Sequence, residues 1–324
     1  GVSRLLVEEI EKFRLCSYTE KSQRYVLFDR DFVVPEEIVR AGMKENFVEM
    51  VRLQNDFYHD LYRQLRPWVF EENRELAENP ANRSLLEGWA KEDARYAISL
   101  ATQTQLGMTI NARNLELMLR RLASLPIAEA QLFSERLYHA TRDIAPSLIR
   151  YTRSTDYDRL TRPRLRAGAE TLLEKGTAKA GREKIGDVRL VSATSDADRQ
   201  AAAALLFASS CRSHRQCLSR AARLSERELK GLFHTVFENM QPYDAALREL
   251  ENIDLQYELV VSASCFAQLK RHRMATVIAQ DYDPRLGVTV PPSVRAAGLQ
   301  KDFMAVMRLT ERVHNRIREK LPSA

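Results

Sequence analysis

A short segment near the start of the chain is rich in side chains that bind anions. Between residues 13 and 26 it holds two arginines, a carboxylate and several hydroxyls, among them Arg14, Ser17, Thr19, Glu20, Ser22 and Arg24. Ionised oxygens are held best by several charge-assisted donors at once, and a guanidinium presents its donors as a planar fork. The segment therefore predicts a pocket for an anion such as a nucleotide phosphate. The alternative is an ordinary polar strand or loop.

A second segment, far along the chain, carries a complementary set of groups. Arg271, His272 and Arg273 follow one another directly, and Gln268 precedes them by three residues. Two guanidinium groups so close together can offer an anion several charge-assisted donors at once. The alternative is that both arginines pair with acidic helices.

Together, the two segments resemble one motif. The flavin-dependent thymidylate synthase family carries the signature R-H-R-x-x-S-x-N-E-x-S-x-R-Y, and each segment looks like a different half of it. The first segment keeps Glu20, Ser22, Arg24 and Tyr25 but has an eroded opening, in which Arg14 is the remaining arginine. The second keeps the R-H-R opening and has lost the nucleotide end. Gly1-Val2-Ser3-Arg4 also resembles the G-V-S-R that precedes the signature in this family.

The resemblance implies cofactors, a substrate and site residues. It implies FAD as cofactor, bound by Arg271, His272, Arg273, Arg14, Asn111 and Arg113. It implies dUMP as substrate, bound by Glu20, Ser22, Gln23, Arg24, Arg95 and Gln268. The implied reaction is the reductive methylation of dUMP to dTMP, in which methylenetetrahydrofolate donates the carbon and NADPH reduces the flavin. It needs no side-chain nucleophile, because the cofactor carries the difficult chemistry.

Some positions depart from the family pattern. The arginine that polarises the pyrimidine ring in the family is replaced here by Leu122, between Arg121 and Ala123. An asparagine on the same helix is replaced by Leu117, and a glutamine before the first signature by Glu9. One helical residue turns by about 100°, so Arg121 cannot stand in for Leu122 without a local shift. The second hypothesis is therefore a non-catalytic protein that kept the fold and binds flavin or nucleotide, or serves in assembly.

The chain repeats itself. Val34-Pro35, Ala41-Gly42 and Arg52-Leu53 recur as Val290-Pro291, Ala297-Gly298 and Arg308-Leu309, each 256 residues later (297 − 41 = 256), and the signatures are 259 apart (273 − 14 = 259). We therefore predict a tandem protein. Residues 1–151 are the latter part of a first module, residues 152–186 a linker, and residues 187–324 the first part of a second module. The resemblance further implies a homodimer that mimics the homotetramer of the family, with half-motifs of the two modules facing each other.

Periodicity predicts an α+β fold, made of helix-rich modules with small antiparallel or mixed sheets. Residues 36–65 have apolar side chains at three-and-four spacing, which indicates one long amphipathic helix. Further helices are expected at residues 84–101, 111–123, 127–149, 196–208 and 225–239. Strands are expected at residues 25–29, 187–192 and 255–263.

Composition narrows the class of protein. With 324 residues, 44% hydrophobic and 29% charged, the chain is expected to be globular and to hold two modules. No apolar run is long enough to span a membrane, and the four scattered cysteines fit a cytoplasmic location without disulfides or a metal site. The net charge of +6 agrees with anionic ligands. Nucleic-acid binding is a third hypothesis that rests on charge alone.

Overall fold

The computed structural model describes residues 1–20, 25–176 and 188–321, and it divides into two compact units. Unit 1 comprises Gly1–Lys179 together with Ser262–Ala324, and unit 2 comprises Ala180–Val261. The packing units thus differ in their bounds from the modules predicted by the repeat. Residues 262–324 pack with the first part of the chain, and the division into homologous modules stays a prediction.

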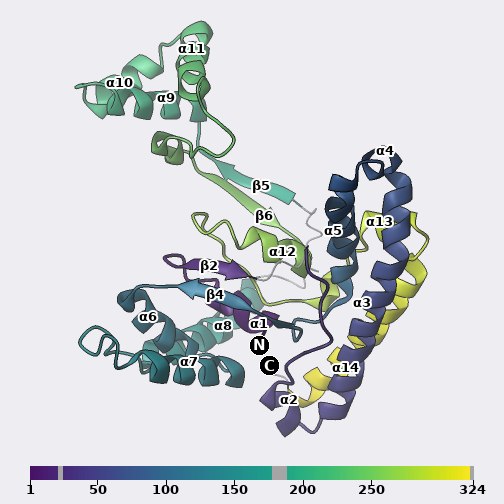
Figure 1. Cartoon of the computed structure of the whole chain (residues 1–324). Helices are drawn as coiled ribbons and strands as arrows, with labels where there is room; N and C mark the ends of the chain where they lie inside the picture. Colours follow the sequence, from purple (N-terminus) through teal and green to yellow (C-terminus); the bar gives the residue numbers. More distant parts are fainter. Residues whose placement is uncertain (21–24, 177–187, 322–324) are drawn as a thin grey trace. The chain divides into compact units, whose positions relative to one another are not determined.

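Unit 1 is mainly helical (Figure 1). Its longer helices are α1 (Arg4–Ile10), α3 (Lys44–Glu72), α5 (Arg83–Ala94), α6 (Ala112–Leu122), α7 (Ala128–Thr141), α8 (Asp156–Gly176), α12 (Ala263–Leu269) and α14 (Gln300–Lys320). Its short helices are α2 (Glu36–Arg40), α4 (Arg74–Ala77), α13 (Pro292–Ala296) and the 3-10 turns η1 (Pro80–Asn82), η2 (Arg95–Ala97) and η4 (Pro284–Leu286). Helix α8 occupies most of the segment predicted to be a linker.

Two small antiparallel sheets of unit 1 hold the first signature in place. Strand β1 (Val2–Ser3) pairs with β3 (Gln103–Thr104), and β2 (Ser17–Glu20) pairs with β4 (Leu106–Thr109). In the second sheet Ser17 lies opposite Thr109, and Glu20 opposite Leu106. The pairing joins the first signature directly to the strand that leads into α6.

The core of unit 1 joins the beginning and the end of the chain. Tyr58, Leu61 and Leu65 of α3 form one cluster with residues of α5 and with Phe303 of α14. These helices lie side by side in Figure 1. A second cluster packs Leu6 and Ile10 of α1 against α6 and α7. Cys16 and Tyr18 of the first signature segment belong to or pack against this second cluster.

Unit 2 has one antiparallel sheet and a group of helices. Its elements are β5 (Val188–Ala193), α9 (Ala197–Ala208), α10 (His214–Ala221), α11 (Glu226–Phe237), the 3-10 turn η3 (Arg248–Asn252) and β6 (Leu255–Leu259). Strands β5 and β6 pair with an irregularity between Leu190 and Ser192. Small residues of α9, with Cys217 and Ala221 of α10, form its core.

The α+β class and most of the predicted helices are confirmed, with two corrections. The helix predicted at residues 36–65 is two helices, because Gly42 adopts a left-handed φ of 66° between α2 and α3. The strand predicted at residues 25–29 is wrong. Its backbone is held by side chains instead, since Lys91 Nζ donates to Tyr25 O and Phe28 N donates to Tyr58 Oη. Among the described residues, no helix has the length and apolar character needed to cross a bilayer.

Candidate functional site

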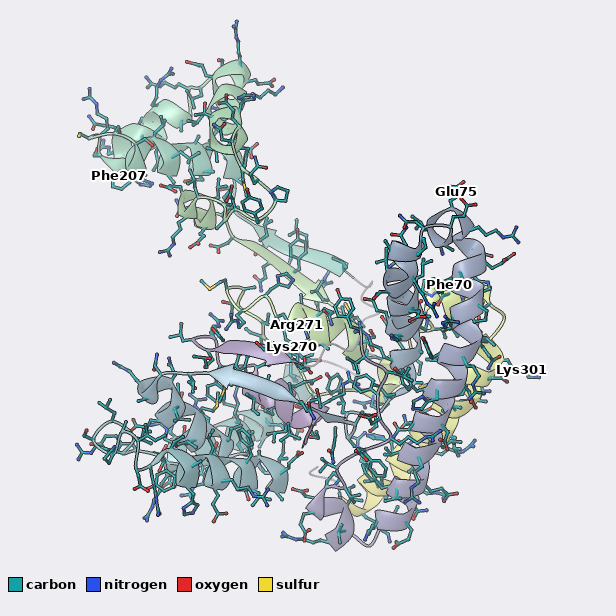
Figure 2. All side chains as sticks on the ribbon, in the orientation of Figure 1. Phe70, Glu75, Phe207, Lys270, Arg271 and Lys301 are labelled. Atoms are coloured by element: carbon teal, nitrogen blue, oxygen red, sulfur yellow. The ribbon has the colours of Figure 1, made fainter. Side chains whose placement is uncertain are left out.

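The two signature segments meet inside unit 1, although they are some 250 residues apart in the chain. Arg271 Nη2 lies 2.9 Å from Glu20 Oε2, and the Glu20 side chain is 8% exposed. Arg273 Nη1 donates to Arg14 O at 3.3 Å, and its guanidinium carbon lies 5.7 Å from the centre of the Tyr18 ring. Figure 2 labels Lys270 and Arg271 at the end of α12. The R-H-R triplet therefore lies along β2, which contains Glu20 of the first signature.

Helix α12 positions the triplet. Ser262 caps this helix by accepting from Cys265 N at 3.1 Å, and the triplet follows directly after its last turn. The adjacent Lys270 Nζ lies 2.9 Å from Glu11 Oε2, with both side chains nearly buried. This ion pair fixes the end of α12 against the end of α1.

Strand β2 positions the groups of the first segment. Tyr18 Oη donates to Ile10 O and Phe13 O at 2.8 and 2.9 Å, which fastens the strand to the end of α1. Burial, with the hydrogen bond to Cys16, raises the pKa of Tyr18 well above its ordinary value. Tyr18 is therefore a neutral hydrogen-bond donor at any working pH. Its ring faces the Arg273 guanidinium.

Arg4, Glu8 and Tyr282 form a buried cluster of charged and polar side chains near Glu20. Arg4 is 4% exposed and Glu8 5% exposed, and Tyr282 Oη donates to Glu8 Oε2 at 2.8 Å. Burial lowers the pKa of Arg4, and the nearby charge of Arg95 lowers it further, while Glu8 and Glu20 act in the opposite direction. Burial and the Glu8 carboxylate together raise the pKa of Tyr282. Arg4 therefore lies close enough to both Arg95 and Glu20 to be affected by their charges.

The remaining predicted residues are less closely gathered. Asn111 is the N-cap of α6 and accepts from Asn114 N, and Asn114 Nδ2 donates to Leu15 O beside Arg14. Arg113 is exposed in the first turn of that helix, so these residues lie near the Arg14 end of β2.

Six further predicted residues have different outcomes. Arg95 lies in η2 and is 7% exposed, near enough to Arg4 for its charge to affect the pKa of that residue. Gln268 lies half-buried in α12, and His272 is exposed after it. Ser22, Gln23 and Arg24 lie outside the described residues. The roles assigned to all of these residues stay predictions.

Several residues of the site were missed by sequence reasoning. Glu11 and Lys270 have opposite charges at equivalent positions of the two signatures, and that relation was readable from the 259-residue offset (270 − 11 = 259). No comparable relation in the sequence connects Glu8 with Tyr282. Their meeting depends on the fold of the segment after the triplet.

Leu122 is a residue of the hydrophobic core. Leu122 is 1% exposed and belongs to the cluster with Leu6 and Met118. Its neighbours Arg120 and Arg121 direct Nε to the carboxylate of Asp158 in α8, at 3.2 and 3.5 Å. Within the described residues, this stretch of α6 therefore presents no arginine toward β2.

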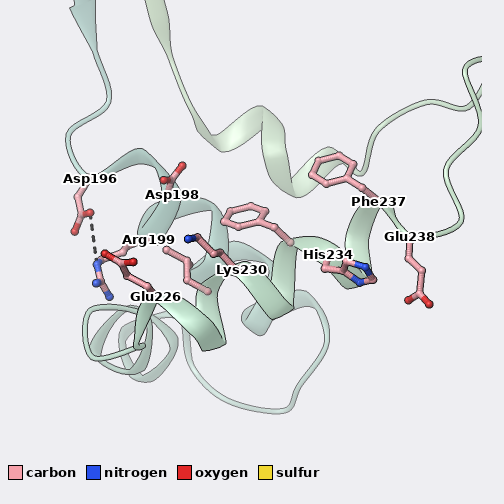
Figure 3. Close-up of a pocket in the computed structure, with 10 residues that line it drawn as sticks. Asp196, Asp198, Arg199, Glu226, Lys230, His234, Phe237 and Glu238 are labelled. Atoms are coloured by element: carbon pink, nitrogen blue, oxygen red, sulfur yellow. Dashed lines mark ion pairs between the residues drawn. The ribbon is translucent and has the colours of Figure 1, made fainter.

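An open hollow of about 850 Å³ lies in unit 2, between the start of α9 and α11 (Figure 3). Asp196 pairs with Arg199 at its edge, and Lys230, His234 and Phe237 line it. It contains none of the predicted site residues. We place the candidate site at the signature contact because buried charges and two halves of one motif pattern meet there, whereas the hollow is wide open and lined by surface side chains.

The chain is similar in sequence to several known proteins. The model of the family described as "Thymidylate synthase complementing protein" matches residues 1–147. A flavin-dependent thymidylate synthase of Clostridium tetani is 29% identical over 155 residues, which cover 47% of this chain and 59% of that protein. The corresponding enzyme of Pyrococcus furiosus is 30% identical over 116 residues, or 36% of this chain and 41% of that protein.

A further relative follows nearly the whole chain. A UPF0159 protein of Thermoplasma acidophilum is 24% identical over 357 residues, which cover 99% of this chain and 70% of the relative. The chain thus spans between 41% and 70% of the length of these three relatives. The family match thus covers the first 147 of the 324 residues.

Proposed function

We propose that the two signature segments of this chain form one binding site for FAD and dUMP. We further propose that the protein catalyses the reductive methylation of dUMP to dTMP, with methylenetetrahydrofolate as carbon donor and NADPH as reductant. The observation that carries the proposal is the contact of Arg271 and Arg273 with Glu20, Tyr18 and Arg14. Each segment alone retains only half of the motif, and the contact makes the halves adjacent.

The residues present fit an anionic dinucleotide. Arg14 and Arg113 are exposed, Arg271 is 44% exposed, and Arg273 lies against an aromatic ring. These four guanidinium groups share one carboxylate, that of Glu20, so the five side chains together carry a net positive charge. Exposed guanidinium groups around a strand suit a diphosphate, because each can donate two parallel hydrogen bonds to its oxygens.

The chain's own residues would bind and orient rather than react. Arg271, His272 and Arg273, with Arg14, Asn111 and Arg113, would hold the flavin dinucleotide, which supplies the hydride when bound. Glu20, Ser22, Gln23, Arg24, Arg95 and Gln268 would hold the nucleotide. The Glu20 carboxylate contacts Arg271 and is also 3.4 Å from Thr104 Oγ1, so it would set the orientation of the first arginine. We also propose that the protein self-associates as a homodimer and works in the cytoplasm.

A second candidate function is favoured by one observation. Leu122 is a core residue, and Arg120 and Arg121 are held by Asp158. A site without an arginine against the pyrimidine ring would lack the positive charge that stabilises charge developing on it. In that case the protein is a non-catalytic binder of flavin or nucleotide, or an assembly protein.

Binding and turnover measurements separate these possibilities. Purified full-length protein should show flavin absorbance bands after loading with FAD, and tritium release from labelled dUMP should accompany turnover. Arg271→Ala and Arg24→Ala should each weaken ligand binding on the order of 10- to 100-fold, since each removes a charge-assisted contact. Arg40→Ala is the matched control, because Arg40 forms an exposed pair with Glu36 in α2.

The outcomes are distinct. FAD binding without tritium release supports the non-catalytic candidate. Unchanged affinity for both ligands in Arg271→Ala and in Arg24→Ala rejects the shared site.

A further inference from the structure

The helices that precede the two signatures are equivalent in detail. Helix α1 spans Arg4–Ile10 and α12 spans Ala263–Leu269, so both ends are offset by 259 residues (263 − 4 = 259; 269 − 10 = 259). Ser3 and Ser262 cap them, and each hydroxyl accepts from the backbone N–H three residues on, at 3.0 and 3.1 Å. The offset therefore identifies equivalent positions in the structure as well as in the sequence.

Equivalent positions of the two copies contact each other. Glu11 and Lys270 are equivalent, and Lys270 Nζ lies 2.9 Å from Glu11 Oε2. Arg14 and Arg273 are equivalent as well, and Arg273 donates to the Arg14 carbonyl. Counterparts meet in this way close to a two-fold axis, where two copies of one element face each other. The ends of α1 and α12 thus face each other at Glu11 and Lys270, as they would across an approximate local two-fold axis.

A residue at such an axis decides which copies pair. If two first copies met in this way, Glu11 would face another glutamate, and if two second copies met, Lys270 would face another lysine. Both side chains are nearly buried, at 7% and 11% exposed, so a like-charge pair would be poorly screened and strongly unfavourable. Only the mixed pairing places opposite charges together.

We propose that the Glu11–Lys270 ion pair selects the partner of each signature segment: it makes the first copy pair with a second copy and rejects pairing of like copies between chains. The interaction surface is the end of α1 with the segment after it, and its partner is the equivalent end of α12. The proposal does not depend on the ligand bound nearby.

The choice of partner determines which contacts Arg271 and Arg273 can form along β2. In the mixed pairing, Arg271 and Arg273 reach Glu20 and Tyr18 of the first copy. The equivalents of Glu20 and Tyr18 in the second copy are Ala279 and Val277 (279 − 20 = 259), which offer neither a carboxylate nor a ring. Pairing of two second copies would therefore leave their arginines without these partners.

Charge reversal tests the pair in the full-length chain. Glu11→Lys and Lys270→Glu should each speed amide hydrogen exchange in α12 by about 100-fold or more, because a buried like-charge pair replaces an ion pair. The double reversal Glu11→Lys/Lys270→Glu should restore exchange to within a few fold of the parent. Glu36→Lys, which reverses a charge of the exposed Glu36–Arg40 pair, should leave α12 unchanged.

Mixing of the two single variants tests selection itself. Co-expressed with different affinity tags, the two variant chains can restore opposite charges only by pairing with each other. The tags should then co-purify, and α12 should regain its protection in the mixture but not in either variant alone. If the double reversal is as unprotected as the single variants, or if the mixture exchanges like the sum of its components, the ion pair does not select partners and the proposal is wrong.

Discussion

At the scale of single residues, Leu122 is the position with the clearest consequence for activity. It stands where the resembling family has a ring-polarising arginine, and here it fills a core between α1, α6 and α7 with 1% of its side chain exposed. The structure thus treats this position as part of the hydrophobic core. An arginine at position 122 would place a charged guanidinium group in this hydrophobic core.

We expect Leu122→Arg to lower the free energy of unfolding by about 4 kcal/mol or more, because an arginine would be buried there without a partner and the leucine contacts would be lost. Urea denaturation measures the change. Leu117→Arg on the same helix is the matched control. Its side chain is 38% exposed, so the expected change is within about 0.5 kcal/mol. A stable, folded Leu122→Arg protein would show that the position opens toward a site.

At the scale of elements, the repeat is visible as a repeated helix-turn-helix. Helices α2 and α13 begin at residues 36 and 292, and α3 and α14 at residues 44 and 300, both 256 apart (292 − 36 = 256; 300 − 44 = 256). Gly42 and Gly298 join them with φ of 66° and 77°. Both glycine N–H groups donate back to the preceding helix, to Val39 O and Arg295 O. The two copies keep the same turn because it depends on one local conformation.

Gly42→Ala and Gly298→Ala should each lower the free energy of unfolding by about 1 kcal/mol, since a Cβ disfavours left-handed backbone. A Cβ at either position would meet no atom within 4 Å, so the effect is conformational rather than steric. Gly168→Ala in helix α8 is the control with the opposite sign. There the added methyl should stabilise by about 0.5–1 kcal/mol. Equal effects at all three glycines in thermal or chemical unfolding would contradict this explanation.

At the scale of the whole molecule, the two copies are no longer interchangeable. The contacts along β2 use Arg271 and Arg273 of the second copy with Glu20 and Tyr18 of the first. The reverse combination would join Lys12 and Arg14 to Ala279 and Val277, which cannot form the same contacts. Of the two equivalent sets of contacts in a paired duplication, one therefore has its full set of partners.

We expect FAD to bind with a stoichiometry of about one per chain rather than two, because a second site would lack Glu20, Tyr18 and one arginine. Flavin absorbance per protein after gel filtration, or calorimetric titration, gives the number. Arg273→Ala should remove the bound flavin, whereas Arg14→Ala, which keeps the carbonyl that Arg273 contacts, should weaken binding less. Two equivalents of FAD per chain would show that both copies kept a site.

Local patterns in the amino-acid sequence specified the repeat, the two half-signatures and most helix positions, including that of α6. These depend on local spacing, on caps and on glycine conformations, all of which involve residues close together in the chain. The tertiary structure decided which halves meet, and it buried Arg95 and Leu122 while leaving His272 exposed. It also assigned residues 262–324 to the same unit as residues 1–179. The burial of a side chain and the pairing of charges such as Glu11 and Lys270 depend on segments that are distant in sequence, so no local pattern specifies them.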